Sequence, residues 1–501
     1  MTQAAEIWLD EAVVLRIPHV EKGGKLCIEG EPGPMSGGAP HERIDSLLAA
    51  FQQNFCVPWN QGELDSHFHE EALNYWAIHC AQQRSDKDPI SRIFVLEGRQ
   101  AEPRLGDGVF LPDKRVVLFG EDSTQMARTL EVLGKKCRRV KVIVVELPIA
   151  MPLTPDTWAR TTYELEKIVR RRLSKPDAQH FLRARASGNQ PIHRLLILRA
   201  PECSFGFLLP GGPVTPVRRG HSWRVKHLHQ PIPLPVERLD VSWICGRDQH
   251  PKVLTRQQQR VLVIGAGALG SFVIESLVKA GVGSLTLVDP DRLSAANLGR
   301  HVLGAEDIGQ AKVKGLGRRL TASWPTVEIT PFPHSLASWL TQRTLEGYDL
   351  VLDLTGEPDA RNRLELARQD YPCPLVIGWM EPFVAAAHAC VLPAGKRWTN
   401  ASRDPLDTWK AINWPADILQ REPACSSSFQ SYTHSAAIHA VALVTEAALA
   451  MLDSEVRQPV IRSMVRGRRF LDAAMPSLEY LPWAAKADLF DAVTWEEPWH
   501  A

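Results

Sequence analysis

A glycine-rich turn is the stretch whose residue types and spacing suit a chemical role most clearly. It reads GAGALG at residues 265–270 and follows the apolar run 261–264. After a strand, Gly265 permits a tight turn, Gly267 lets a phosphate approach bare backbone, and Gly270 lets the next helix pack close to the sheet. The N-terminus of that helix adds unpaired N–H groups and partial positive charge. The pattern therefore predicts a phosphate-binding turn.

Polar residues downstream indicate which nucleotide suits this turn. Asp289 ends the next apolar run, where a carboxylate can accept hydrogen bonds from ribose hydroxyls. Asn297, Arg300 and Lys312 follow. Two cations beside a phosphate turn suit a triphosphate, because Arg and Lys stabilise the charge that develops when a carboxylate attacks the α-phosphate. We therefore predict an ATP site, and a Rossmann-like unit whose glycines serve only packing remains the alternative.

The motif order DxD, NLxR and GQxK closely resembles the adenylating domain of ubiquitin-activating-type enzymes and of their bacterial relatives MoeB and ThiF. The resemblance covers roughly residues 260–392. It implies a Rossmann-like α/β domain over 241–501, ATP and Mg2+ as cofactors, and a homodimer. It also implies a partner protein whose free C-terminal carboxylate becomes an acyl-adenylate.

The expected magnesium site departs from that family. MoeB-like relatives read Asp-Cys-Thr-Asp-Asn here, and the second aspartate helps to hold the metal, whereas this chain has Gly356. Because a hard cation needs oxygen ligands, we assign Asp353 and keep Glu357 as the alternative. MoeB-like relatives also often carry paired CxxC zinc ligands. The nine cysteines of this chain form no CxxC pair, so we expect thiols and no structural zinc.

Cys27 is the first candidate nucleophile. A cysteine between apolar neighbours is commonly a small core residue, but residues 17–28, IPHVEKGGKLCI, resemble the active-site segment of ubiquitin-conjugating enzymes. The resemblance makes Cys27 the thioester-carrying residue and puts His19 at the position of an asparagine that polarises the oxyanion. Only 26 residues precede Cys27, fewer than that family's helix and strands require. We therefore expect 1–85 to be a shortened or degenerate α+β conjugating domain.

Cys425 is the second candidate nucleophile. It lies in a Ser-rich stretch shortly before an expected helix, where exposure and the positive field of the helix N-terminus can lower a thiol pKa. An ordinary exposed thiol remains the alternative. Activating-type enzymes that form a thioester carry their cysteine in a loop after the nucleotide half, and Cys425 fits that place.

Together these signals predict a relay in which an acyl group passes from ATP-activated adenylate to Cys425, to Cys27 and then to a target amine. The chain resembles bacterial fusions of conjugating and activating domains, and residues 70–76, EEALNYW, resemble a segment common in them. That resemblance implies anti-phage CBASS operons and, as partner, a ubiquitin-like protein or a cyclic-nucleotide synthase. A sulfur-carrier adenylyltransferase, which needs no Cys27, and a nucleotide-binding scaffold, which needs neither cysteine, remain open.

Composition predicts an ordinary globular protein of two to four domains, since the chain has 501 residues, 44% apolar residues and a net charge of +1. This balance gives no argument for binding nucleic acid or an anionic membrane. The apolar stretch 436–452 carries His439 and Glu446, so we expect a buried helix and a cytoplasmic protein. Residues 86–240 form an α/β middle segment of unknown role.

Apolar patterning predicts the following elements. Strands are expected at 13–15, 92–96, 116–120, 140–146, 350–354 and 375–379, and helices at 41–55, 126–133, 157–173 and 432–452.

Overall fold

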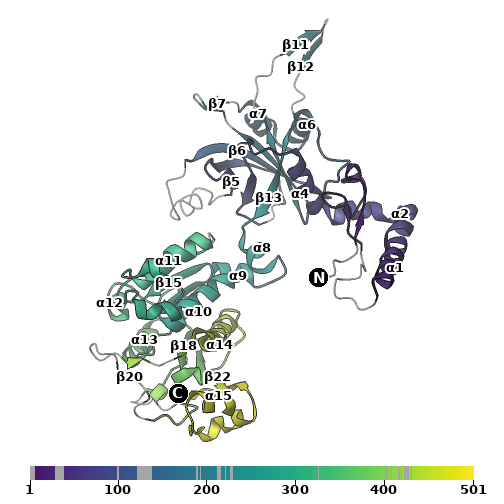
Figure 1. The fold of residues 1–501 in the computed structure, drawn as a ribbon. Helices are drawn as coiled ribbons and strands as arrows, with labels where there is room; N and C mark the ends of the chain where they lie inside the picture. Colours follow the sequence, from purple (N-terminus) through teal and green to yellow (C-terminus); the bar gives the residue numbers. More distant parts are fainter. Residues whose placement is uncertain are drawn as a thin grey trace. The chain divides into compact units, whose positions relative to one another are not determined.

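The structure is a computed structural model. It describes residues 6–28, 39–98, 101–120, 138–184, 186–187, 190–191, 193–210, 216–219, 222–225, 230–324, 326–400, 404–407, 409–415, 418, 420–421, 428–429 and 432–500. The chain divides into two compact units, Met1–Asp240 and Val241–Ala501 (Figure 1). The predicted domain bounds, 1–85, 86–240 and 241–501, stay predictions.

An eight-stranded sheet organises the second unit, in the order β16-β15-β14-β17-β18-β19-β22-β23. The first five strands run parallel, with β14 between β15 and β17, and the last three are antiparallel. The bounds are β14 Arg260–Ile264, β15 Ser284–Val288, β16 Glu328–Phe332, β17 Leu350–Asp353, β18 Leu375–Met380, β19 Ala386–Leu392, β22 Val460–Arg466 and β23 Ala492–Pro498. The predicted α/β, Rossmann-like fold is confirmed.

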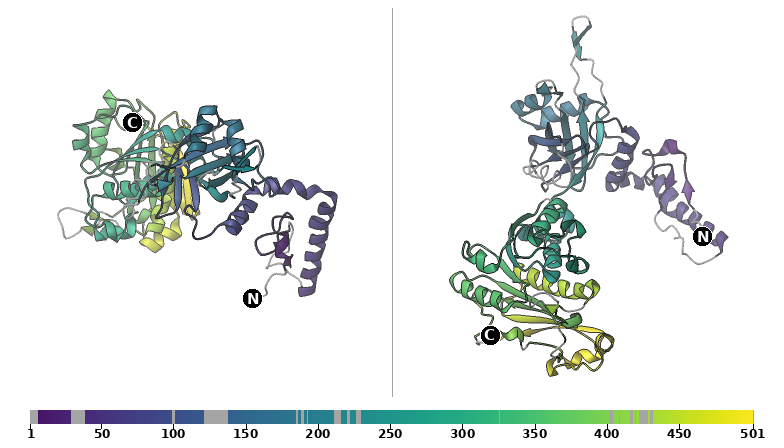
Figure 2. Two further views of the ribbon diagram at one scale, coloured as in Figure 1. Left: turned by 90° about the horizontal axis from the view of Figure 1, so that it is seen from above. Right: turned by 60° about the vertical axis from the view of Figure 1, so that its left-hand side comes forward.

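Helices cover both faces of this sheet (Figure 1, Figure 2). Along β14, Val261 and Val263 belong to one apolar core and Leu262 and Ile264 to another, because successive strand residues point to opposite faces. The helices are α8 Val241–Gly246, α9 Val253–Gln258, α10 Ala268–Lys279, α11 Lys312–Ser323, α12 Leu336–Leu340, α13 Pro358–Asp370, α14 His434–Leu452 and α15 Arg468–Ala474. Short strands β20 (Gln420–Arg421) and β21 (Ser428–Phe429) pair with each other.

Helix α14 is long and apolar enough to cross a membrane by length and composition. Ten of its residues are nevertheless buried, and it contributes Ala440, Val444 and Ala447 to the core that it shares with α10 and β19. A helix that is apolar on most of its surface is expected inside a large core. The predicted buried helix is therefore confirmed.

A closed barrel forms the centre of the first unit, in the order β10-β13-β3-β5-β4-β6-β9. Its strands are β3 Arg92–Val95, β4 Arg104–Leu111, β5 Val116–Phe119, β6 Val140–Pro148, β9 Arg194–Arg199, β10 Ser204–Leu209 and β13 Ile232–Arg238. One core fills the barrel, and a second lies between the barrel and helices α4 (Ala72–Gln83), α6 (Thr162–Arg172) and α7 (Lys175–Arg183). Two hairpins, β7–β8 (Ala186–Ser187 and Gln190–Pro191) and β11–β12 (Pro216–Arg219 and Ser222–Val225), lie outside the barrel order.

The N-terminal part of this unit pairs β1 (Ile7–Trp8) with β2 (Lys25–Leu26). Helical segments follow: α1 Pro40–Phe51, the π-helix η2 Gln52–Cys56, α2 Val57–Gln61, the 3-10 helix η3 Glu63–Ser66 and α3 His67–Glu70. The prediction of a helix at 41–55 is confirmed. The strand predicted at 13–15 is wrong, because Asp10 caps a 3-10 turn at Glu11–Val13 by accepting the N–H of Ala12.

Most predicted strands are present with bounds within two residues, and the helix predicted at 157–173 begins later than expected. Thr161 caps α6 by accepting the N–H of Glu164, and Thr157 instead closes a turn with Thr154. A side chain that satisfies the first N–H groups of a helix fixes where it starts. The helix predicted at 126–133 lies outside the described residues.

Candidate functional site

A pocket of about 360 Å³ lies at the carboxyl ends of β14, β15 and β17, where ligands of open α/β sheets bind. It is lined by Ile264, Gly265, Gly267, Val288, Asp289, Pro290, Asp291, Lys312, Ser335, Leu336, Ala337, Leu354, Thr355, Glu357, Asp359, Ala360 and Arg363. Four of the predicted site residues, Gly265, Gly267, Asp289 and Lys312, thus meet in one pocket.

The three glycines of the turn differ in what surrounds them. Gly265 has φ +90°, and a Cβ there would lie 2.9 Å from the carbonyl of Leu354, so only glycine fits. Gly267 caps α10, and a Cβ there would have no neighbour within 4 Å. At Gly270 a Cβ would lie 2.0 Å from the Gly265 carbonyl oxygen. Gly270 therefore serves close packing, and Gly267 leaves open space at the N-terminus of the helix.

Asp289 and His301 hold the turn from two sides through Ala266. The Ala266 N–H donates to Asp289 Oδ2 at 2.7 Å, and Asp289 Oδ1 accepts the N–H of Asp291 at 2.8 Å. Leu303 N–H donates to His301 Nδ1, so the proton of this ring lies on Nε2, which donates to the Ala266 carbonyl at 2.8 Å. Burial lowers the pKa of His301 and keeps the ring neutral. His301 was not predicted as a site residue, and its one signal in the sequence is its place directly after Arg300.

Besides Arg363, the described lining of the pocket contains one buried cation, Lys312. Its side chain is only 8% exposed, and Nζ donates to Asp291 Oδ2 at 2.7 Å. Asn297 and Arg300 belong to the 3-10 helix η4 (Ala295–Arg300) and are not among the described residues that line the pocket. Asn297 Oδ1 accepts the N–H of Ser294, and the Arg300 guanidinium lies 6.0 Å from the Tyr432 ring centre.

The carboxylate assigned to magnesium, Asp353, lies beneath the pocket. It is fully buried, its Oδ1 accepts hydrogen bonds from Thr355 N–H and hydroxyl, and burial raises its pKa. Its role stays a prediction. The exposed carboxylates along the pocket wall are those of Asp291, Glu357 and Asp359. Among the described residues, no group of three or more His, Cys, Asp or Glu is arranged to hold a metal.

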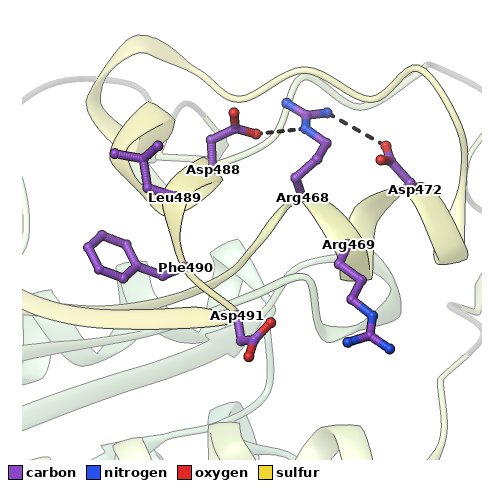
Figure 3. A pocket seen from close by; sticks show the side chains of 7 residues that line it. All are labelled: Arg468, Arg469, Asp472, Asp488, Leu489, Phe490 and Asp491. Carbon is purple, nitrogen blue, oxygen red and sulfur yellow. Dashed lines mark hydrogen bonds and ion pairs between the residues drawn. The ribbon is translucent and has the colours of Figure 1, made fainter.

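A second hollow, of about 670 Å³, lies around Arg468 and Arg469 at the start of α15 (Figure 3). Arg468 Nε donates to Asp488 at 2.7 Å, and a second nitrogen lies 3.9 Å from Asp472 (Figure 3). Two carboxylates thus balance the charge of Arg468. None of the residues predicted from the sequence lies here, and we do not assign the hollow to the nucleotide.

Cys27 is exposed and lies beside a cluster of titratable side chains. Its N–H donates to the His19 carbonyl at 2.9 Å, and the His19 N–H donates to the Tyr75 hydroxyl at 2.8 Å. The His19 ring contacts Glu71 through Nδ1 at 3.1 Å and His67 through Nε2 at 2.7 Å. Both ring nitrogens of His19 therefore face protein partners. Sequence analysis did not assign the other members of this cluster, although Glu71 and Tyr75 lie in the EEALNYW segment.

Two other cysteines of the second unit belong to the core of the sheet. Cys373 and Cys390 are buried there, and burial raises the pKa of both thiols. Cys425 lies outside the described residues. The helix after it begins at His434, where Thr433 accepts the N–H of Ala436.

Comparison with known proteins gives a family match within the second unit and a relative that is similar along most of the chain. Residues 248–392 match the model of the ThiF family. The chain is 24% identical over 492 residues to the ATP-dependent ubiquitin transferase-like protein Cap2 of Pseudomonas aeruginosa. This match covers 90% of this chain and 82% of the Cap2 protein. The sulfur carrier protein adenylyltransferase of Thermus thermophilus is 37% identical over 139 residues, 26% of this chain and 51% of its own.

A solved structure, E. coli MccB with ATP, covers 42% of this chain and 61% of its own at 14% identity and a TM-score of 0.31, too low a likeness to carry an argument. The family match confirms the predicted ThiF-type adenylating domain, and the Cap2 relative, which is similar along most of the chain, is named as ATP-dependent. The predicted resemblance to a bacterial fusion with a ubiquitin-activating-type adenylyltransferase is also confirmed.

Proposed function

We propose that this adenylating chain activates the C-terminal carboxylate of a partner protein and passes the acyl group, as a thioester, through Cys425 and Cys27 to a target amine. The observation that carries the first step is the pocket in which Gly267, at the N-terminus of α10, lies with Lys312. Similarity to Cap2 along 90% of the chain supports the later steps.

In the first step the triphosphate lies against the turn, where the N-terminus of α10 offers N–H groups and partial positive charge. The partner's carboxylate oxygen attacks the α-phosphorus, an O–P bond forms, and pyrophosphate leaves. Lys312 stabilises the developing charge from within the pocket. Asn297 and Arg300 are proposed for the same phosphates.

Magnesium fits the carboxylate oxygens of this pocket, since hard cations prefer such ligands. Glu357 lines the pocket and is exposed, whereas Asp353, the residue assigned from sequence, is fully buried. We therefore favour Glu357 for the metal and keep Asp353 beneath it as a support for the Thr355 turn. When bound, the metal neutralises charge on the phosphates.

In the later steps the Cys425 thiolate attacks the adenylate carbonyl and AMP leaves, Cys27 exchanges with that thioester, and an amine replaces Cys27. Each exchange splits a difficult amide synthesis into activated steps. The exposure of Cys27 supports its role. We propose a ubiquitin-like protein or a cyclic-nucleotide synthase as the partner, and a cytoplasmic homodimer acting in anti-phage CBASS defence without nucleic acid or membrane.

The test combines pyrophosphate exchange with detection of thiol-sensitive adducts on the full chain, using candidate partners of both kinds. We expect Cys425→Ala to retain exchange and to lose both adducts, and Cys27→Ala to retain the adduct on Cys425 alone. Cys56→Ala, at a half-buried cysteine of the same unit as Cys27, is the matched control. If both alanine variants keep every adduct of the parent, the relay is wrong and a sulfur-carrier type of adenylation is favoured. Absence of exchange in the parent would refute the adenylation step as well.

A further inference from the structure

A chain of hydrogen-bonded titratable groups lies beside Cys27 in the N-terminal unit. Glu71 Oε2 accepts the Tyr75 hydroxyl at 2.7 Å, and Glu71 Oε1 lies 3.1 Å from His19 Nδ1. His19 Nε2 lies 2.7 Å from His67 Nδ1. The members come from segments about fifty residues apart in sequence, so the fold brings them together.

We propose that these hydrogen-bonded groups form a proton relay. In it His67 is the general base that takes the proton of the attacking amine, and His19 and Glu71 position the His67 ring. The inference rests on the proposed function, because it assigns the base for the last step at Cys27.

The order of donors and acceptors follows from the carboxylate. An ionised Glu71 has no proton to give, so it accepts from both Tyr75 and His19 Nδ1–H. His19 Nε2 then carries a lone pair and accepts Nδ1–H of His67. This leaves the lone pair of His67 on Nε2. A neutral imidazole whose far nitrogen is held by a hydrogen bond has a fixed tautomer, which is what a general base requires.

Two observations connect this relay to Cys27. The Cys27 N–H donates to the carbonyl of His19, which fixes the two residues to each other. Burial raises the pKa of Tyr75, the hydrogen bond that its hydroxyl accepts from the His19 N–H lowers it, and the Glu71 carboxylate and the Cys27 sulfur raise it. The thiol therefore lies within electrostatic range of the Tyr75 hydroxyl that closes the relay.

The relay is also reachable from solvent and held in an uncommon conformation. The side chains of His19 and Glu71 are 20% and 38% exposed, and His67 is half-buried. His19 has φ +63°, which few residues other than glycine adopt, and hydrogen bonds on both of its backbone groups hold it there. Conformations of this kind persist where the surrounding structure enforces them, often at functional sites.

The step balances as follows. The amine nitrogen attacks the thioester carbonyl, a C–N bond forms, and the N–H proton moves to His67 Nε2. The C–S bond breaks, and Cys27 Sγ leaves as the thiolate, which receives a proton from His67 or from water. The positive charge on His67 is stabilised through His19 by Glu71.

Phe68 and His69 are neighbours of His67 on the same helical segment, α3. The Phe68 ring lies 5.0 Å from that of Tyr75, and His69 Nδ1 contacts the Pro152 carbonyl at 3.1 Å. His69 thus faces away from the relay although it lies two residues from His67. It provides a matched control, as exposed Glu70 does for Glu71.

The experiment uses the full chain and no natural partner. Cys27 is loaded from the mercaptoethanesulfonate thioester of N-acetylglycine, and its discharge to n-butylamine is followed across pH by mass spectrometry of the Cys27 peptide. We expect His67→Gln to load normally, to discharge about 100-fold more slowly, and to lose the pH dependence of discharge that the parent shows. Glu71→Gln should shift that pH dependence, and His69→Gln and Glu70→Gln should match the parent.

Discharge of His67→Gln at the parent rate with an unchanged pH profile would overturn the relay, and so would a parent Cys27 that holds no acyl group. The outcome is separable from that of the proposed function. If chemically loaded Cys27 discharges through His67 but forms no ATP-dependent adduct with any partner, the relay stands and the proposed acyl transfer fails. If Cys27 is loaded in an ATP-dependent reaction but discharges from His67→Gln at the parent rate, the proposed acyl transfer stands and the relay fails.

Discussion

Alanine substitutions at Gly267 and Gly270 separate nucleotide binding from folding within one turn. At Gly267 the added methyl group has no protein neighbour within 4 Å, and its φ of −82° lies outside the left-handed region that favours glycine. Exchange of glycine for alanine at a helix N-cap costs about 1 kcal/mol or less. The methyl group would occupy space that the phosphate needs, so we expect ATP affinity to fall at least tenfold, about 1.4 kcal/mol.

At Gly270 the same methyl group meets the backbone. It would lie 2.0 Å from the Gly265 oxygen and 2.9 Å from its carbon, so turn and helix must separate by roughly 1.5 Å to reach an ordinary contact. Overpacking of this kind costs about 1–3 kcal/mol. For a unit of this size each kcal/mol lowers the melting temperature by about 2–4 °C. We therefore expect Gly270→Ala to melt roughly 2–12 °C below the parent.

The assays are calorimetric titration with ATP and thermal unfolding of the full chain with and without nucleotide. Gly267→Ala should keep the melting temperature of the free parent and lose most of the ATP-induced increase, whereas Gly270→Ala should lower the melting temperature without ATP. Parent-like ATP affinity in Gly267→Ala would refute the assignment of this turn to phosphate. A parent-like melting temperature in Gly270→Ala would show that the close approach of helix and turn is not needed.

Two further predictions follow from charges. Lys312→Ala should lower pyrophosphate exchange by about 10²-fold or more, as loss of a charge-stabilising group does, while alanine at exposed Lys314 should leave exchange unchanged; equal rates would exclude Lys312. Burial lowers the pKa of His79, stacked on Trp158, from 6.5 to about 4, so its neutral form stabilises the fold fully above pH 6.5 and this contribution is lost as pH falls through about 4. Between pH 6.5 and about 4, the melting temperature of His79→Gln should decline less than that of the parent and of the exposed-site control His180→Gln. An unchanged slope would contradict the lowered pKa of His79.

The sheet of the second unit was predictable because both of its faces are covered. Parallel strands buried on two sides read as continuous apolar runs, so the predicted strands at 350–354 and 375–379 agree with β17 and β18. The 3-10 turn at Glu11–Val13 was not predictable from apolar residues alone. It depends on one hydrogen bond, which the Asp10 carboxylate accepts from the Ala12 N–H. Side-chain hydrogen bonds of this kind compete with regular secondary structure, and the apolar pattern of a sequence does not report them.

The site was predictable where its residues share one local unit. Gly265, Gly267 and Asp289 come from consecutive strands of the sheet, and they meet because parallel strands end at one edge. Leu336 and Arg363 line the same pocket from segments that carry no motif. Their place depends on how α12 and α13 pack, which spacing in the sequence does not encode.

Ala266 explains how the turn and the motif after it act as one piece. Its N–H is held by Asp289 and its carbonyl by His301, so the backbone proposed to face a phosphate is already fixed in the free protein. Such preorganisation avoids the free-energy cost of ordering the turn on binding. Arg300 is the direct neighbour of His301 in sequence, so its backbone lies next to the residue that is hydrogen-bonded to Ala266. The contact of Arg300 with phosphate stays a prediction, and its guanidinium lies 6.0 Å from the Tyr432 ring centre.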